Sequence, residues 1–198
     1  SDVYVDGLSF FQVSSLSQVL KPEIHPKCQK PERSLNAWYV EAGHNAVTVY
    51  VNFAAKDPDQ CLVEVSVRPA VFFPKQTGIN YITLRGFEIR HAATPWAPPT
   101  AEQIGAVGPH WSKGWVIEDC HIHNVRCSGI SLGKERASGQ NYWSENPVKH
   151  GTQRERETVF QALRLGWSRD NIGSHIVRRN HIHDCEQTGI CGHLGAIF

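Results

Sequence analysis

Two stretches of the chain, residues 114–130 and 174–190, have the same alternation of apolar and polar positions. In each, a short apolar run is followed by a polar corner, then by His-Ile-His and by the pair Gly-Ile, and the two copies align without a gap. A weaker third copy occupies residues 81–89. Each copy therefore has the pattern of strand, bend and strand, and is too short for amphipathic helices.

Repeat units of this size cannot bury an apolar face alone, so they stack, with equivalent residues in ladders about 4.8 Å apart. The pattern predicts an all-β fold, a right-handed parallel β-helix of incomplete coils. One set of apolar side chains should form a continuous core: Leu84, Phe87, Ile89, Ile117, Cys120, Ile122, Val177 and Ile182. The alternation turns the four repeat histidines outward: His121, His123, His181 and His183.

Residues 1–70 do not repeat, and their shorter alternations predict a β-sandwich-like portion that begins with a hairpin on Asp6-Gly7. A carbohydrate-binding surface using Trp38 or Tyr39 is the functional alternative for this portion. The coils then occupy 71–198, with an insertion at 133–173.

The insertion should contain one helix. A capping box at 152–155 begins it, and Gly166 is a suitable C-terminal cap. Its apolar stripe would consist of Val159, Phe160, Leu163 and Leu165.

Charge and composition narrow the class of partner. The chain has 20 basic and 19 acidic residues and a net charge of +1, so no overall field attracts nucleic acid or an anionic membrane. No apolar run approaches the roughly 20 residues that cross a bilayer, and no signal peptide is visible. An uncharged partner is expected. A homo-oligomer, and a cytoplasmic or a secreted location, are left open.

The six cysteines lie far apart without a Cys-x-x-Cys pair, which disfavours a zinc ribbon or a redox motif. Four of them belong to the repeat and are interpreted as small apolar ladder residues, with a disulfide as the alternative. The stacked His-x-His pairs could hold zinc or copper. Outward histidines of a repeat are more often a solvated ladder, so neither a metal site nor a cofactor is predicted.

Two sets of residues could carry carbohydrate chemistry. Glu186 precedes the last Gly-Ile strand, and Glu102 precedes an Ile-Gly pair, so both should lie at strand ends along a groove. Satisfying turn amides is an equally good explanation for each carboxylate. The second set lies in loops and contains Trp96, His110, Trp111 and Trp143. An exposed indole suits a sugar ring, although most tryptophans belong to the core.

The stretches 85–94, 96–103, 110–115 and 127–134 resemble the β-helical β-xylosidases of the glycoside hydrolases, a family similar to glycoside hydrolase family 120. That family places a β-sandwich within its first coils, in agreement with residues 1–70. The resemblance implies a retaining mechanism with an aspartate nucleophile and a glutamate acid/base, about 5 to 5.5 Å apart. It implies that Glu186, Glu102, Trp96, His110 and Trp111 face the sugar.

No residue of this chain matches the catalytic pair, which is expected beyond Phe198, so no catalytic residue is assigned. The chain is expected to be a piece of a β-xylosidase that acts on xylo-oligosaccharides. The alternatives are a pectate-lyase-like polysaccharide lyase and a non-catalytic β-helical carbohydrate-binding or surface protein. A lyase would need clustered aspartates for calcium, whereas Asp119, Asp170 and Asp184 are scattered.

Overall fold

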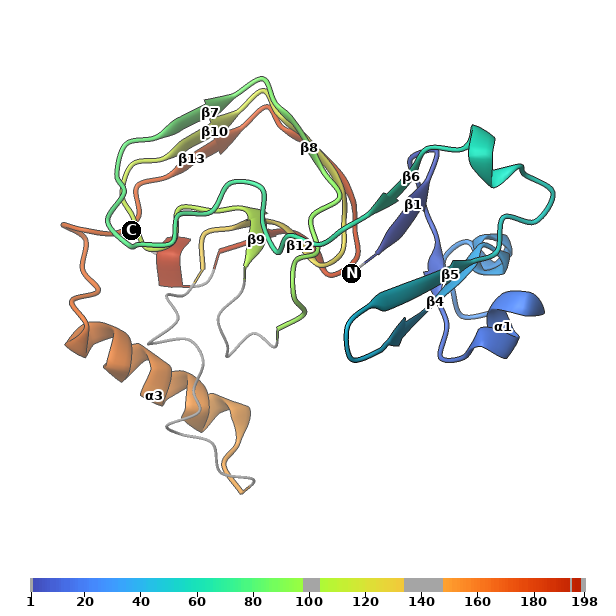
Figure 1. The fold of residues 1–198 in the computed structure, drawn as a ribbon. Helices are drawn as coiled ribbons and strands as arrows, with labels where there is room; N and C mark the ends of the chain where they lie inside the picture. The colour runs from blue at the N-terminus through green and yellow to red at the C-terminus, as the bar shows by residue number, and fades with distance from the viewer. Residues whose placement is uncertain (1, 98–103, 134–147, 193, 197–198) are drawn as a thin grey trace. The chain divides into compact units, whose positions relative to one another are not determined.

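The structure is a computed structural model that describes residues 2–97, 104–133, 148–192 and 194–196. It is mostly β-structure arranged in small sheets (Figure 1). The chain forms two compact units, Ser1–Val67 and Arg68–Phe198. Among the described residues, no helix combines the length and the apolar character that a membrane span requires.

The first unit contains two three-stranded sheets. In one, β1 (Val3–Val5) pairs antiparallel with β2 (Leu8–Ser9) and with β6 (Val63–Val65). In the other, β4 (Ala37–Ala42) lies between β3 (Phe11–Gln12), which is parallel to it, and β5 (Val47–Val51), which is antiparallel. The hairpin predicted on Asp6-Gly7 is confirmed, since both residues have positive φ, as a two-residue hairpin turn requires.

Short helices connect these strands: α1 (Leu16–Leu20), η1 (Pro31–Leu35) and η2 (Pro58–Gln60). The core of the unit contains Trp38, which is 1% exposed and donates from Nε1 to the Phe10 carbonyl at 3.1 Å. The suggestion that Trp38 forms a sugar-binding surface is therefore wrong, because its ring is packed inside. Tyr39 is partly exposed and stacks on Tyr50.

The second unit is built from three successive coils, each of which contributes one strand to each of three parallel sheets. The first sheet contains β7 (Thr83–Arg85), β10 (Val116–Glu118) and β13 (Ile176–Arg178), which lie side by side in Figure 1. The second contains β8 (Glu88–Arg90), β11 (His121–Val125) and β14 (His181–Cys185). The third contains β9 (Gly105–Val107), β12 (Ser128–Ser131) and β15 (Thr188–Cys191).

The register matches the sequence repeat. Ile117 pairs with Leu84 and Val177, and Ile122 pairs with Ile89 and Ile182. Seven of the eight predicted core residues belong to or pack against one apolar cluster: Leu84, Ile89, Ile117, Cys120, Ile122, Val177 and Ile182. This part of the prediction is confirmed.

Phe87 is the exception, with 56% of its surface exposed. Phe87 is the equivalent of Cys120 in the next coil, because their carbonyls accept equivalent hydrogen bonds. The backbone N–H of His121 donates to the Phe87 carbonyl, and that of His181 donates to the Cys120 carbonyl. The Cys120 thiol fits inside this corner, with Sγ 3.2 Å from the Glu118 carbonyl. A phenyl ring is much larger than a thiol, and it turns outward.

Residues at equivalent corners of successive coils have a left-handed backbone conformation. Gly86, Asp119 and Arg179 have φ of 75°, 54° and 54° at the first corner of their coils. Asn124 and Asp184 have φ of 50° and 48° within the second strand. Asn and Asp tolerate this conformation better than most side chains, which explains their place directly after each His-Ile-His.

The insertion forms α3 (Gly151–Arg164), followed by Gly166 at φ 90°. The helix begins earlier than predicted, because His150 rather than Thr152 is the N-cap and shares a capping box with Gln153. The predicted apolar stripe is largely wrong: Phe160, Leu163 and Leu165 are exposed, whereas Thr158 and Ala162 are buried and Val159 is partly buried. The helix therefore packs through small side chains. After β15, η4 (Leu194–Ala196) ends the described part.

Candidate functional site

His110 and Trp111 form a strained corner between β9 and β10, with φ of 47° and 54°. Positive φ is uncommon for residues other than glycine, and for a bulky residue it marks strain that clusters at functional sites. Both side chains were predicted to face a sugar.

Each of these two side chains has a ring nitrogen that is buried without a partner among the described residues. The His110 Nδ1 lies 2.7 Å from the Pro74 carbonyl, which leaves Nε2 unpaired. Trp111 is only 6% exposed, packs with Ala162, Ile172 and Leu194, and has an unpaired Nε1. Trp111 therefore does not present an exposed indole face, because its ring belongs to a small core beside α3. Buried polar atoms nearly always have partners, so this corner is a candidate for ligand binding.

The loop that carries Trp96 is fixed to the repeat. Thr94 Oγ1 accepts hydrogen bonds from the backbone N–H groups of Cys127 and Ser128, at 2.8 and 3.2 Å. The Ala97 carbonyl accepts from Gln187 Nε2 at 2.8 Å. Trp96 itself is 69% exposed, as expected for an indole that could meet a sugar.

The Gln187 contact brings the loop of Trp96 beside the turn between β14 and β15, which holds the exposed Glu186. Glu102 and Trp143 lie outside the described residues. Trp96 and Glu186 precede strands of the third sheet, β9 and β15, whereas His110 and Trp111 follow β9. The sheet therefore lies between the two pairs of residues. The structure thus brings Trp96 and Glu186 to one end of a sheet and the strained corner to its other end.

A buried carboxylate in the first sheet was not among the predicted site residues. Glu118 is 0% exposed and accepts hydrogen bonds from Arg85 Nε and Arg178 Nε, both at 2.6 Å, and from Arg179 Nη2 at 3.0 Å. The hydrogen bonds from Arg178 and then Arg85 lower the pKa of Glu118 below its usual value of 4.5. Arg179 also bonds both carboxylate oxygens of Asp119, at 2.6 and 2.8 Å. The repeat alignment could have predicted this ion-pair cluster, since it sets Glu118 opposite Arg85 and Arg178.

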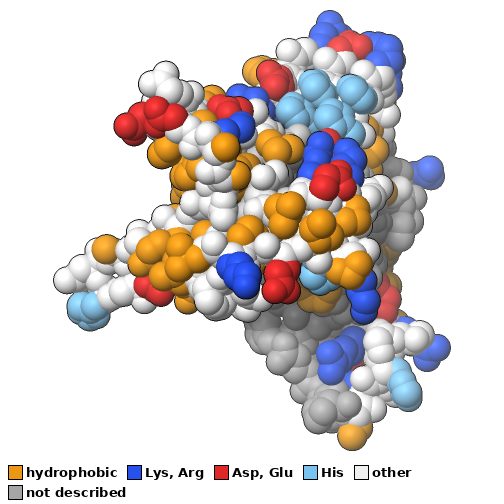
Figure 2. Space-filling model, turned by 90° about the vertical axis from the view of Figure 1, so that its right-hand side faces the viewer, with side chains coloured by type: hydrophobic (Ala, Val, Ile, Leu, Met, Phe, Trp, Pro, Cys, Tyr) orange, Lys and Arg blue, Asp and Glu red, His pale blue; other side chains and the backbone are white. Residues whose placement is uncertain are grey.

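The four repeat histidines form a cluster on the second sheet, and Figure 2 shows imidazoles gathered in one surface patch. The rings of His121 and His181 stack at 4.9 Å and those of His123 and His183 at 5.0 Å. The His121 Nε2 lies 2.8 Å from the His183 Nε2. Desolvation, followed by the charges of the other three histidines, lowers the pKa of His121. The side chains of His123 and His183 are 13% and 37% exposed, so the cluster is only partly solvated.

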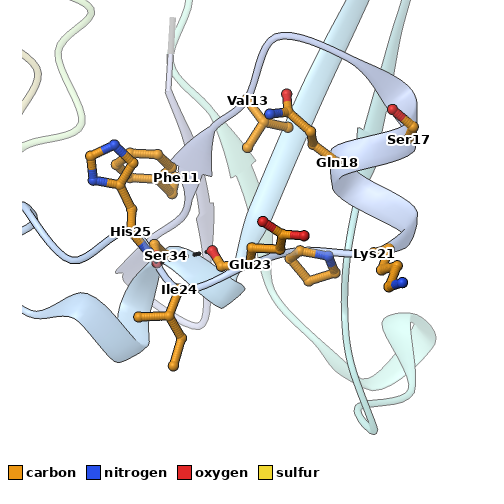
Figure 3. A pocket seen from close by; sticks show the side chains of 10 residues that line it. Phe11, Val13, Ser17, Gln18, Lys21, Glu23, Ile24, His25 and Ser34 are labelled. Carbon is orange, nitrogen blue, oxygen red and sulfur yellow. Dashed lines mark hydrogen bonds between the residues drawn. The ribbon is translucent and has the colours of Figure 1, made fainter.

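The first unit contains a pocket of about 430 Å³ between β3, α1 and the segment that leads to η1 (Figure 3). Phe11 and His25 lie ring beside ring at one end, with centroids 5.8 Å apart. The Ser34 hydroxyl donates to the Pro31 carbonyl and accepts from the His25 N–H. No motif in the sequence indicated this pocket, because part of its lining comes from the loop between α1 and η1, which has no periodicity.

Two comparisons with known proteins bear on the chain. Residues 1–65 match the family model described as the insertion domain of glycoside hydrolase 120. The chain is also similar to the solved structure "The complex structure of XylC with xylose", at 47% sequence identity and a TM-score of 0.93. That likeness covers 98% of this chain and 32% of the other, so the chain spans about a third of the length of that structure. No curated protein is similar enough to add to these comparisons. The match of the insertion domain and the likeness over almost the whole chain agree: this chain belongs to glycoside hydrolase family 120.

Proposed function

We propose that this chain is part of a retaining β-xylosidase that removes xylose from xylo-oligosaccharides, and that its coils belong to a right-handed parallel β-helix. One observation carries the proposal, the 47% identity over 98% of the chain to XylC, whose structure contains xylose. The near-zero net charge suits an uncharged saccharide.

The proposed sugar-facing residues are Glu186, Glu102, Trp96, His110 and Trp111. Of the described ones, Trp96 and Glu186 lie at one end of the third sheet, and His110 and Trp111 lie at the other. Trp96 offers an exposed indole to the C–H face of a sugar ring. Glu186 supplies a carboxylate, and a charge-assisted hydrogen bond to a sugar hydroxyl is stronger than a neutral one. Trp111 would contribute through its unpaired Nε1–H rather than through its buried ring face.

The nucleophile and the acid/base are proposed to lie outside these 198 residues. A glycosidase acid/base needs a raised pKa to be protonated near neutral pH. Four of the described carboxyl groups have a pKa that their surroundings hold below the ordinary value: Asp6, Glu88, Glu118 and Asp119. Their hydrogen bonds to Lys, His and Arg side chains keep them ionised, which does not suit a general acid.

An aryl β-xyloside assay of the complete protein, with the first sugar product observed by proton NMR, tests the reaction. Retention predicts that β-xylose forms first and then mutarotates. Initial release of α-xylose would overturn the retaining mechanism. Absence of turnover on aryl β-xylosides, together with turnover on another aryl glycoside, would overturn the substrate.

Two substitutions test the binding residues. Glu186→Ala should lower kcat/KM by about 5- to 150-fold, the equivalent of the roughly 1 to 3 kcal/mol lost when a hydrogen-bonding partner is removed. Trp96→Ala should lower kcat/KM about tenfold, whereas Trp96→Phe should retain most of it. Glu32→Ala, an exposed residue of the first unit, is the matched control. Unchanged kinetics in both Glu186→Ala and Trp96→Ala would exclude them from the site.

A further inference from the structure

The histidine cluster of the second sheet has the donor set of a transition-metal site. His121, His123 and His183 each offer one ring nitrogen, and these three atoms lie within 4.8 Å of one another. Two of the nitrogens, His121 Nε2 and His183 Nε2, are 2.8 Å apart. We propose that these three histidines bind one divalent first-row transition-metal ion, with Zn²⁺ as the best fit.

Hydrogen bonds of the Nδ1 atoms of His183 and His123 support this assignment. The His183 Nδ1 lies 2.9 Å from Asp184 Oδ2, and the His123 Nδ1 lies 2.7 Å from Asn124 Oδ1. Both acceptors are oxygens, so each Nδ1 can donate to its oxygen and leave Nε2 for the ion. The proton through which His123 Nε2 bonds Glu88 would be released when the ion binds. A ligating histidine almost always donates its other N–H in this way, which fixes the tautomer and raises the basicity of the ligand.

The backbone holds these two acceptors in place. Asn124 and Asp184 each directly follow a His-Ile-His and have φ of 50° and 48°, so the same left-handed kink turns each side chain back toward the preceding ring. Equivalent residues of two coils therefore accept the same hydrogen bond from the preceding histidine ring.

The dimensions fit a tetrahedral ion. Nitrogen ligands 2.0 to 2.1 Å from zinc lie about 3.3 Å from one another. That value falls between the 2.8 Å separation and the 4.8 Å limit of the cluster, so small ring rotations bring the three atoms to coordination distance.

Charge near the cluster favours a cation. The Glu88 Oε1 lies 3.2 Å from the His123 Nε2, because Glu88 is the register partner of His121 in the preceding coil. Arg90 lies 3.8 Å from the same carboxylate oxygen and offsets part of its charge. Three imidazoles with one position left for water or a carboxylate are a donor set that zinc accepts.

The test is titration of the purified, chelator-treated protein with Zn²⁺ by calorimetry, with Co²⁺ absorption as a second readout. One ion should bind per chain, and Co²⁺ should give the intense visible bands of tetrahedral coordination. His121→Ala, His123→Ala and His183→Ala should each weaken Zn²⁺ binding by at least tenfold. Asp184→Gly tolerates the left-handed backbone but removes the oxygen acceptor of His183 Nδ1, and should weaken binding by about 10- to 100-fold.

His44→Ala, at an exposed residue of the first unit, serves as the matched control and should change Zn²⁺ affinity by less than about threefold. The proposal is overturned if the folded protein binds no Zn²⁺, or if its binding survives His183→Ala unchanged. It is overturned equally if His44→Ala weakens binding as much as the cluster variants do. Circular dichroism establishes that each variant is folded.

Discussion

Arg178 donates from its Nε to Oε2 of Glu118 at 2.6 Å, and the two residues are register partners on β13 and β10. Arg85, the partner of Glu118 on β7, bonds the other carboxylate oxygen. One carboxylate thus joins three coils, while Arg179 donates to it from the corner. Acid and base alternate along this ladder, so that stacking equivalent residues places opposite charges together.

Replacing Glu118 by Gln should lower the melting temperature by several degrees. The amide keeps the shape of the side chain, but it leaves three guanidinium groups without their shared negative charge. Thermal unfolding followed by circular dichroism measures the effect, and the loss should be larger at low salt, where repulsion between the arginines is less screened. Glu32→Gln is the control. An unchanged melting temperature would show that the ladder does not stabilise the stack.

Gly129→Ala should lower the free energy of unfolding by about 1 to 3 kcal/mol, a typical cost of overpacking. A Cβ at this position would lie 2.8 Å from the Gly189 carbonyl oxygen of the adjacent strand, which can move only if the two coils separate. The equivalent change in the next coil, Gly189→Ala, meets only the Ile182 Cγ2 at 3.3 Å and should change stability by less than about 1 kcal/mol. Denaturant unfolding of the two variants compares them directly, and equal losses would contradict the packing argument.

The gapless repeat made the register of the coils predictable. Once Ile117 and Ile122 are aligned with Val177 and Ile182, alternation alone places them in the core, where the structure has them. Phe87 belongs to the same alignment but is exposed, because the alignment does not show how much space a corner leaves for a side chain.

Burial of tryptophans could not be predicted because it depends on partners distant in the sequence. Trp38 hydrogen-bonds Phe10, and Trp111 packs with Ala162 of α3 and with Leu194. Trp96, by contrast, stands beside a proline in a loop and is exposed as expected. The same limit applies to α3, whose small residues rather than its large ones are buried.

Acid should weaken the fold partly through His175. Burial alone lowers the pKa of His175 from 6.5 to about 4. As the pH falls from 6.5 toward 4, the unfolded chain gains a proton that the folded chain does not, so stability is lost over this range and is fully present above it. Since the side chain is only partly buried, the contribution is about 1 to 2 kcal/mol.

His175→Asn should therefore flatten the dependence of unfolding free energy on pH between 6.5 and 4. An Asn oxygen can still accept the hydrogen bond that the Trp115 N–H donates to His175 Nδ1. The measurement is urea unfolding at several pH values, with His44→Asn as an exposed control. A variant with the same slope as the parent protein would contradict the assignment.

Thr94→Val should lower the free energy of unfolding by about 2 kcal/mol or more. Thr94 is 0% exposed, and its hydroxyl oxygen is the acceptor for the backbone N–H groups of Cys127 and Ser128. Valine has the same shape but leaves both buried donors unpaired, and each unpaired group costs about 1 to 3 kcal/mol. Thr94→Ser keeps the oxygen and should recover most of the loss, whereas Thr48→Val on an exposed strand position should have little effect. Because Trp96 follows two residues later, the valine variant should also raise the KM for a xyloside more than the serine variant does. Stability and KM that were identical in the valine and serine variants would mean that the hydroxyl does not anchor the loop.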